Sequence, residues 1–407
     1  MMHRKISLVG GLVSAMFTLS FSDCATAQDA AAQTPAVPRP LRHEAGHKKL
    51  IAFPRPQPDT AFLRQHIAQM EQTPFDGTVF SVKIDAPGLP PDRALFHFHN
   101  WSRRVFTEAE FKDALEDLKA TKFTRFTHNF LRFTALSQNL DWFDDYSSVI
   151  NNARVAAVFA RQANEVTGGK VPGIKFDPEQ YADKIFTYPH QRDKDTKSFD
   201  VYAAQVRQRG REVMEAFQEG YPDLTVFMSI GYSGTWYYTQ GTKTLPEVDY
   251  GLLAAFMDGM TEAARGKTKI VDGFENSYAY NVLTRYKDFN VGGIRGIFEY
   301  GYHGVDVKAL KFIQADPQKY RQTTSLGFGL WLDKNYGDWN SEDVSKNFYT
   351  PEAFEATLRK ALEVSDEYVW IYSDLKPQWW TAEGKPKNIH PAYLEAMRNA
   401  RKGLVAD

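Results

Sequence analysis

The chain has 407 residues, with 49 basic and 50 acidic side chains and a formal net charge of −1. This balance argues against a protein that captures nucleic acid or an anionic membrane by electrostatic attraction. Aromatic residues make up 14% of the chain, and their flat faces suit sugar stacking as well as ordinary core packing.

The first 27 residues have the pattern of a cleavable signal peptide. Residues 3–5 are basic or imidazole-bearing, residues 6–21 are apolar, and Ala25-Thr26-Ala27 offers the small side chains of a cleavage site. The apolar run is short for a membrane span. We therefore predict export to the periplasm or the medium, with cleavage after Ala27 and no membrane-spanning segment.

Cys24 is the only cysteine, so the mature protein would have no disulfide and would depend on an ordinary core. A lipidated Cys24 is an alternative, although Asp23 fits poorly before a lipid attachment site. Residues 28–47 are rich in Ala, Pro and Gln, and we predict that they form a flexible linker.

From residue 48 onward, short apolar runs alternate with amphipathic stretches. In chain order the predicted strands are Lys49–Phe53, Gly77–Ile84, Phe123–Phe133, Val171–Phe176, Leu224–Ile230, Lys269–Phe274, Thr324–Leu332 and Tyr368–Tyr372. The predicted helices are Asp59–Gln72, Glu108–Thr121, Asp144–Val166, Phe199–Glu219, Tyr250–Arg265, Pro351–Ser365 and Pro391–Arg401. The sixth helix is expected in the irregular segment between Glu275 and Tyr320.

Strands that alternate with helices predict parallel βαβ units. Eight such units predict an α/β protein with a single (β/α)8 barrel over residues 48–403 and elaborated βα loops. Asp59, Thr107 and Thr350 stand where N-caps are expected. A doubly wound open sheet is the alternative, but PRPQPD rather than a Gly-rich phosphate loop follows the first strand.

Carboxylates follow two of the predicted strands. Asp177 and Glu179 end the fourth strand, and Glu275 follows the sixth. In parallel barrels the chemistry lies at the carboxyl ends of the strands, so these side chains are expected to meet. Two facing carboxyl groups are the equipment for breaking a glycosidic bond.

We assign Glu179 as the candidate acid and Glu275 as the candidate nucleophile or base. Asp177 would set the proton balance of Glu179, because adjacent carboxylates push their pKa values apart. These roles are open to permutation, and the separation of the pair would decide between retention and inversion. Asp177 in a plain turn is the structural alternative.

Polar and aromatic side chains collect at the same predicted strand ends. The candidate substrate-binding residues are Asn129, Arg132, His99, Trp101, Tyr181, Tyr232, Trp236, Asn276, Tyr278, Trp331, Asp333 and Trp380. Core packing remains an equal alternative for the tryptophans, and a buried ion pair remains one for Arg132.

The pattern resembles the TIM-barrel glycoside hydrolase superfamily from His47 to Arg401. Asp177-Pro178-Glu179-Gln180-Tyr181 stands where its large retaining clan carries an Asn-Glu pair, and Trp331-Leu332-Asp333 lacks that clan's glutamate. Lys175-Phe176-Asp177 is similar to the Lys-aromatic-Asp run of α-galactosidase-like barrels. That resemblance implies Asp177 as nucleophile and Glu275 as acid–base. The stretches 74–77 and 272–278 resemble those of uncharacterised exported bacterial proteins.

The predicted function is an exported glycoside hydrolase that cleaves a poly- or oligosaccharide without a cofactor or a metal. One alternative is a barrel that binds glycan without cleaving it. A second is a metal-dependent hydrolase using His97 and His99, which share one strand face. A third is a glycan lyase, whose product would be unsaturated.

Overall fold

The computed structural model describes residues 48–404, except 182, 241, 335–337 and 375. The predicted signal peptide and linker therefore lie outside the described residues. Among the described helices, none has the length and apolar character that crossing a membrane requires.

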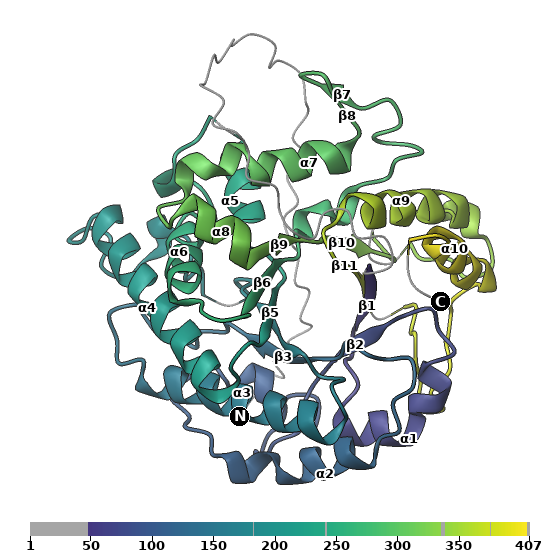
Figure 1. Cartoon of the computed structure of the whole chain (residues 1–407), viewed down its shortest axis with the longest axis horizontal. Helices are drawn as coiled ribbons and strands as arrows, with labels where there is room; N and C mark the ends of the chain where they lie inside the picture. Colours follow the sequence, from purple (N-terminus) through teal and green to yellow (C-terminus); the bar gives the residue numbers. More distant parts are fainter. Residues whose placement is uncertain (1–47, 182, 241, 335–337, 375, 405–407) are drawn as a thin grey trace, which may run out of the picture. The chain divides into compact units, whose positions relative to one another are not determined.

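Parallel strands form a closed ring at the centre of the molecule, with helices around it (Figure 1). The strands are β1 (Lys49–Pro54), β2 (Gly77–Phe80), β3 (Phe130–Thr134), β4 (Gly173–Asp177), β5 (Thr225–Met228), β6 (Lys269–Asp272), β9 (Thr324–Leu326), β10 (Phe328–Trp331) and β11 (Tyr368–Ser373). Their order is β10-β11-β1-β2-β3-β4-β5-β6-β9.

The ring closes through an interrupted seventh strand. β9 pairs with β6 and β10 pairs with β11, and only Gly327 separates the two halves. The Gly327 N–H donates to Asp272 O at 2.8 Å, and a Cβ at Gly327 would lie 2.6 Å from Tyr368 O. Only glycine fits this close approach. The predicted (β/α)8 barrel is therefore confirmed, with β9 and β10 sharing one strand position.

A helix follows each strand position, as predicted. These helices are α1 (Thr60–Met70), α2 (Lys112–Ala120), α3 (Ser147–Val166), α4 (Phe199–Gly220), α6 (Leu253–Ala263), α8 (Pro317–Thr323), α9 (Pro351–Val364) and α10 (Pro391–Arg401). The loop after β5 adds α5 (Tyr232–Thr239), which the sequence did not indicate. The loop after β6 adds α7 (Ile297–Asp306) and a hairpin of β7 (Asn290–Val291) with β8 (Ile294–Arg295).

All three predicted N-caps are confirmed. Asp59 accepts from the Phe62 N–H at the start of α1, and Thr350 accepts from the Ala353 N–H at the start of α9. Thr107 forms a capping box with Glu110 before a short 3₁₀ helix that leads into α2. Each cap satisfies N–H groups that a helix start leaves unpaired.

Two separate apolar clusters fill the molecule. The inner cluster lies inside the barrel and includes Ile51, Phe53, Val79, Phe130, Phe227, Val271, Tyr278, Trp331, Tyr368 and Trp370. The outer cluster joins the other faces of the strands to the helices. Successive side chains of a strand point to opposite faces, so each strand contributes to both clusters. The same alternation decides which polar side chains reach the barrel mouth.

Candidate active site

Asp177 is the last residue of β4 and lies fully buried at the carboxyl end of the barrel. Its Oδ2 accepts from Arg132 of β3 at 3.0 Å and from the Tyr181 hydroxyl at 2.9 Å. Arg132 also donates to Gln57 Oε1 at 2.7 Å. Because a buried carboxylate needs a countercharge and hydrogen-bond donors, the Arg132–Asp177 ion pair fixes one corner of the site.

Glu179 is held by a turn that begins at Asp177. The Glu179 N–H donates to Asp177 Oδ1 at 3.2 Å, which is the turn contact that the structural alternative for Asp177 anticipated. The turn carries the Glu179 carboxyl group forward over the mouth. There it contacts the Tyr181 hydroxyl, while 38% of the surface of Tyr181 remains exposed.

Glu275 reaches the site from the opposite wall. After β6 the chain passes Gly273, where a Cβ would lie 2.4 Å from Met228 O. It then turns at Phe274, whose φ of 42° is unusual for a bulky residue. The Glu275 N–H donates to Ser229 O at 3.1 Å and begins the 3₁₀ helix Glu275–Ala279. The strained turn thus directs the Glu275 carboxyl group inward.

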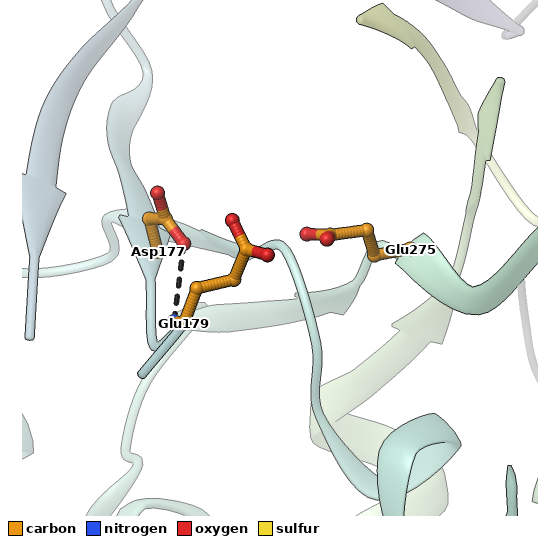
Figure 2. Close-up of side chains that lie close together, drawn as sticks. All are labelled: Asp177, Glu179 and Glu275. Carbon is orange, nitrogen blue, oxygen red and sulfur yellow. Dashed lines mark hydrogen bonds between the residues drawn. The ribbon is translucent and has the colours of Figure 1, made fainter. Parts of the chain in front are cut away.

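The predicted carboxylates meet at one point (Figure 2). Asp177, Glu179 and Glu275 each offer a carboxylate oxygen within 4.8 Å of the others. The Glu179 and Glu275 carboxyl groups face each other, with Glu179 in the middle of the group (Figure 2). The sequence expectation that these side chains lie together is therefore correct in its geometry.

The two glutamates hold protons more tightly than free carboxyl groups. Burial, followed by the charge of Asp177, raises the pKa of Glu179 to about 7. Burial, followed by the charges of Glu179 and Asp177, raises the pKa of Glu275 well above its usual range. Because each side chain also shifts the pKa of the other and their oxygens lie within 4.8 Å, we treat them as one pair that shares a proton near neutral pH.

A second pair of carboxylates lies at the ends of the seventh and eighth strands. Asp333 Oδ1 accepts from Trp331 Nε1 at 3.0 Å and from the Asp374 N–H at 2.9 Å. Arg55 pairs with Asp374 at 3.4 Å, and Asp374 Oδ2 is buried without a hydrogen-bond partner. Burial raises the pKa of Asp333 to about 6. Paired acceptors beside an indole ring are suited to sugar hydroxyls.

Aromatic side chains link this second pair to the catalytic cluster. The Tyr278 ring lies 5.8 Å from Trp331 and 5.1 Å from Trp370, and the charge of Glu275 acts on its phenol. Asn276 follows Glu275 directly, and its Oδ1 is buried without a hydrogen-bond partner. Tyr278, Trp331, Asp333 and Asn276 therefore lie after the strands from which the sequence predicted them, and their contact with substrate stays a prediction.

Two predicted substrate ligands lie away from the barrel mouth. Strand β3 begins at Phe130 and not at Phe123, so Asn129 precedes the strand and lies at its amino end. There it accepts from the Thr78 N–H and donates to Lys170 O. Trp380 packs against Phe126, also before β3, at 6.0 Å. The expectation that these two bind substrate is wrong, because their contacts are structural.

Three further candidates belong to the outer core. Trp101 is fully buried and lies 5.7 Å from Phe176. Tyr232 and Trp236 lie on α5, which replaces the predicted strand-end loop. Tyr232 is fully buried and donates to Asp258 at 2.7 Å. The structure therefore contradicts the proposed sugar-binding role of all three, because their faces are covered by protein.

We expect Trp236→Ala to lower the free energy of unfolding by about 3–5 kcal/mol, as is usual for a buried tryptophan. The Trp236 ring packs against Phe274 at 5.9 Å and Tyr300 at 5.5 Å. It also fills the space at Gly304, where a Cβ would lie 2.1 Å from the indole. Urea unfolding of the variant and of Trp236→Phe measures this cost. Equal stability of all three proteins would show that the ring is not part of the core.

The two histidines do not form a metal site with each other. His97 is buried, and its Nδ1 contacts Ser81 Oγ at 3.1 Å. His99 Nε2 contacts Arg93 O at 3.0 Å. Within the described ranges, the group of His, Cys, Asp and Glu side chains close enough to share an ion is Asp177, Glu179 and Glu275. Neither His97 as a metal ligand nor His99 as a substrate ligand is supported by these contacts.

Sequence reasoning missed three residues of the site. Gln57 gave no signal because it follows β1 in a proline-rich loop. Tyr238, whose pKa is raised by burial and by the charge of Glu275, gave none because it lies on the unpredicted α5. Lys175 could have been found. It stands two residues before Asp177 in β4, and this spacing places both side chains on the same face of the strand.

The chain is similar to two solved glycan-degrading enzymes. An endocellulase from Pyrococcus horikoshii, in complex with cellotetraose, has a TM-score of 0.46 and 9% identity, covering 88% of this chain and 92% of that one. A Bacteroides ovatus GH5 xyloglucanase, in complex with a XXXG heptasaccharide, has a TM-score of 0.42 and 10% identity. The match covers 86% of this chain and 68% of that one. No protein-family model and no curated protein sequence matches the chain. Scores of this size carry no argument, so the fold assignment rests on the strand order and the function on the site.

Proposed function

We propose that this protein is a glycoside hydrolase acting on a poly- or oligosaccharide. The observation that carries the proposal is the convergence of Glu179 and Glu275 at the carboxyl end of the barrel, with nearest oxygens within 4.8 Å. A site that keeps one carboxyl group protonated and its partner ionised has both the acid and the nucleophile for this reaction. Export after removal of residues 1–27 is part of the same proposal.

In the proposed first step, a Glu275 carboxylate oxygen attacks the anomeric carbon. The glycosidic C–O bond breaks as Glu179 gives its proton to the leaving oxygen. In the second step, Glu179 removes a proton from water, and the resulting hydroxide breaks the glycosyl–Glu275 ester. The Tyr181 hydroxyl, which contacts both Asp177 and Glu179, would hold Glu179 in place while its charge changes.

A permutation of these roles has two supporting observations. The first is that burial and the charges of Glu179 and Asp177 raise the pKa of Glu275 well above its usual range, which suits an acid. The second concerns Asp177. Asp177 is fully buried, with Arg132 and Tyr181 as donors to the same oxygen, and this environment suits a permanently ionised nucleophile. In that version Glu275 is the acid–base, as the α-galactosidase-like resemblance implies. The two versions of the mechanism can be distinguished by adding an external nucleophile. It would restore activity to the variant that lacks the catalytic nucleophile, which is Glu275 in one version and Asp177 in the other.

The substrate would lie across the mouth between the catalytic cluster and the second carboxylate pair. The exposed ring of Tyr181 provides aromatic surface along this path, whereas the rings of Tyr278 and Trp331 are nearly buried in the inner cluster. Asp333 and Asp374 would accept hydrogen bonds from sugar hydroxyls.

The test is a panel of plant, bacterial and fungal glycans incubated with purified protein that begins at residue 28. Hydrolysis is supported if new reducing ends appear and no unsaturated product is detected by its ultraviolet absorbance. An unsaturated product would replace the proposal with a lyase. Binding measured by calorimetry without any cleavage would favour the non-catalytic barrel. Activity abolished by a chelator and restored by a metal ion would favour the metal-dependent alternative.

We expect the product to keep the anomeric configuration of the substrate. Carboxyl groups about 5–5.5 Å apart are typical of retaining enzymes, whereas inverting enzymes need about 6.5–9.5 Å to admit water. Proton NMR of the first product formed, recorded before mutarotation, measures the outcome. Inversion would rule out the covalent mechanism proposed for Glu275.

A further inference from the structure

Lys175 lies inside the barrel, one layer deeper than the carboxylates. Its side chain is fully buried, and its Nζ donates to Ser229 Oγ at 3.0 Å. The Nζ also lies 4.1 Å from the ring centre of Trp370, 4.4 Å from that of Phe227 and 5.5 Å from that of Phe53. Aromatic faces attract a cation at these distances, so the barrel interior holds a positive charge in a fixed position.

This charge acts on the active-site carboxylates. Burial lowers the pKa of Lys175 to about 7, while Asp177 and Glu275 oppose that effect. In return, the Lys175 ammonium lowers the pKa of Glu275. The charges of the buried cations and carboxylates at the site can be compared. When Lys175 is protonated, Lys175 and Arg132 carry two positive charges, which balance Asp177 and one ionised member of the Glu179–Glu275 pair.

Phenols also lie near the cage, among them Tyr368 at 5.2 Å from Phe227. Tyr278 lies 5.1 Å from Trp370, and Tyr372 lies 5.9 Å from Phe53. Burial raises the pKa of Tyr278 well above its usual range, so it stays neutral wherever a glycosidase works. Glu179 also raises the pKa of Lys175, and Arg132 lowers it. Both effects are weaker than the effect of Glu275.

We propose that Lys175 is a positioning residue of the active site. Its ammonium, fixed by three aromatic rings and Ser229, is a countercharge that favours the ionised form of the Glu179–Glu275 pair. Lys175 is buried one layer below the carboxylates, with its Nζ bonded to Ser229, so we infer that it acts through the carboxylates. The inference rests on the proposed function only for its consequence in catalysis. The electrostatic effect itself is measurable without any substrate.

The test removes the charge and keeps the volume. Lys175→Met places an apolar chain of similar length in the aromatic cage, and Lys175→Gln is made in parallel because it can still contact Ser229. Lys269→Met is the matched control. Lys269 lies on β6 but pairs with Glu367 at the opposite end of the barrel. Side-chain carboxyl signals of ¹³C-labelled glutamate are titrated in each folded protein, with Glu179→Gln and Glu275→Gln used for assignment.

In the Lys175 variants the first deprotonation of the pair should move up by about one pH unit, the effect of losing an opposite charge nearby. It should not move in Lys269→Met. Where a glycan is cleaved, the acidic limb of kcat/KM should move by the same amount. Unchanged titration in folded Lys175 variants would overturn the inference. A shifted titration together with no cleavage of any glycan by the wild type would uphold it and reject only the proposed function.

Discussion

Replacing either glutamate of the pair with glutamine should lower kcat by about 10²–10⁴-fold, the usual contribution of acid–base catalysis. The loss should be larger for Glu275→Gln if Glu275 is the nucleophile, because no covalent intermediate can then form. The amide is similar in size and leaves the turn at Asp177 and the strained turn at Phe274 intact. Both variants should therefore remain folded, which circular dichroism and thermal unfolding can verify.

Substrates with an activated leaving group separate the two roles. They need little protonation, so Glu179→Gln should recover most of its rate on them if Glu179 is the acid. Azide should rescue the Gly or Ala variant of the nucleophile and give a glycosyl azide of inverted configuration. Rescue at Asp177 and not at Glu275 would select the permuted mechanism. Glu116→Gln, on the exposed face of α2, is the matched control.

Full activity in both glutamate variants would remove Glu179 and Glu275 from the mechanism. The class of enzyme could still be right in that case, with Asp333 and Asp374 as the next carboxylates to replace. Loss of activity with loss of structure would decide nothing about chemistry. The stability measurements therefore precede the kinetic ones.

The alternation of apolar and amphipathic segments predicted the barrel, because each parallel strand buries both faces and each helix buries one. The sequence predicted that Asp177, Glu179 and Glu275 lie together. A carboxyl group directly after a buried parallel strand lies at the carboxyl end of the barrel. The helix boundaries were predicted closely where caps were present, as in α9 and α10.

The errors have a common cause. A tryptophan that stacks on a sugar differs from one that packs in the core only in the face of the helix or strand that it occupies. The sequence does not give exact element boundaries, so it does not specify that face for Trp101, Trp236 or Trp380. Asn129 was misplaced because seven residues before β3 read as strand although they form its connecting loop. Lys175 was given no role of its own, although its spacing from Asp177 indicates that the two side chains share a face of β4. A lysine in a strand is normally exposed, and only the aromatic side chains of distant strands make its burial possible.

Arg132→Met should lower the free energy of unfolding by about 3–5 kcal/mol, the range for breaking a buried ion pair on one side. The Arg132 and Asp177 side chains are 12% and 1% exposed, so Asp177 would lose the cation that contacts it directly, at a place where water cannot replace it. The Tyr181 hydroxyl and the Glu179 N–H alone do not compensate a buried charge. Denaturant unfolding at neutral pH is the measurement.

The double variant Arg132→Met, Asp177→Asn identifies the source of this loss. It removes both charges, so it should regain most of the stability that Arg132→Met loses. Arg398→Met is the control, because Arg398 pairs with Glu395 on an exposed face of α10 at 3.7 Å and such pairs contribute little. If the double variant is no more stable than Arg132→Met, the arginine acts through its hydrogen bond to Gln57 and through the Phe53 ring, whose centre lies 5.2 Å from its guanidinium. The ion pair would then not be what fixes Asp177, and the case for a preorganised carboxylate cluster would rest on Glu179 and Glu275 alone.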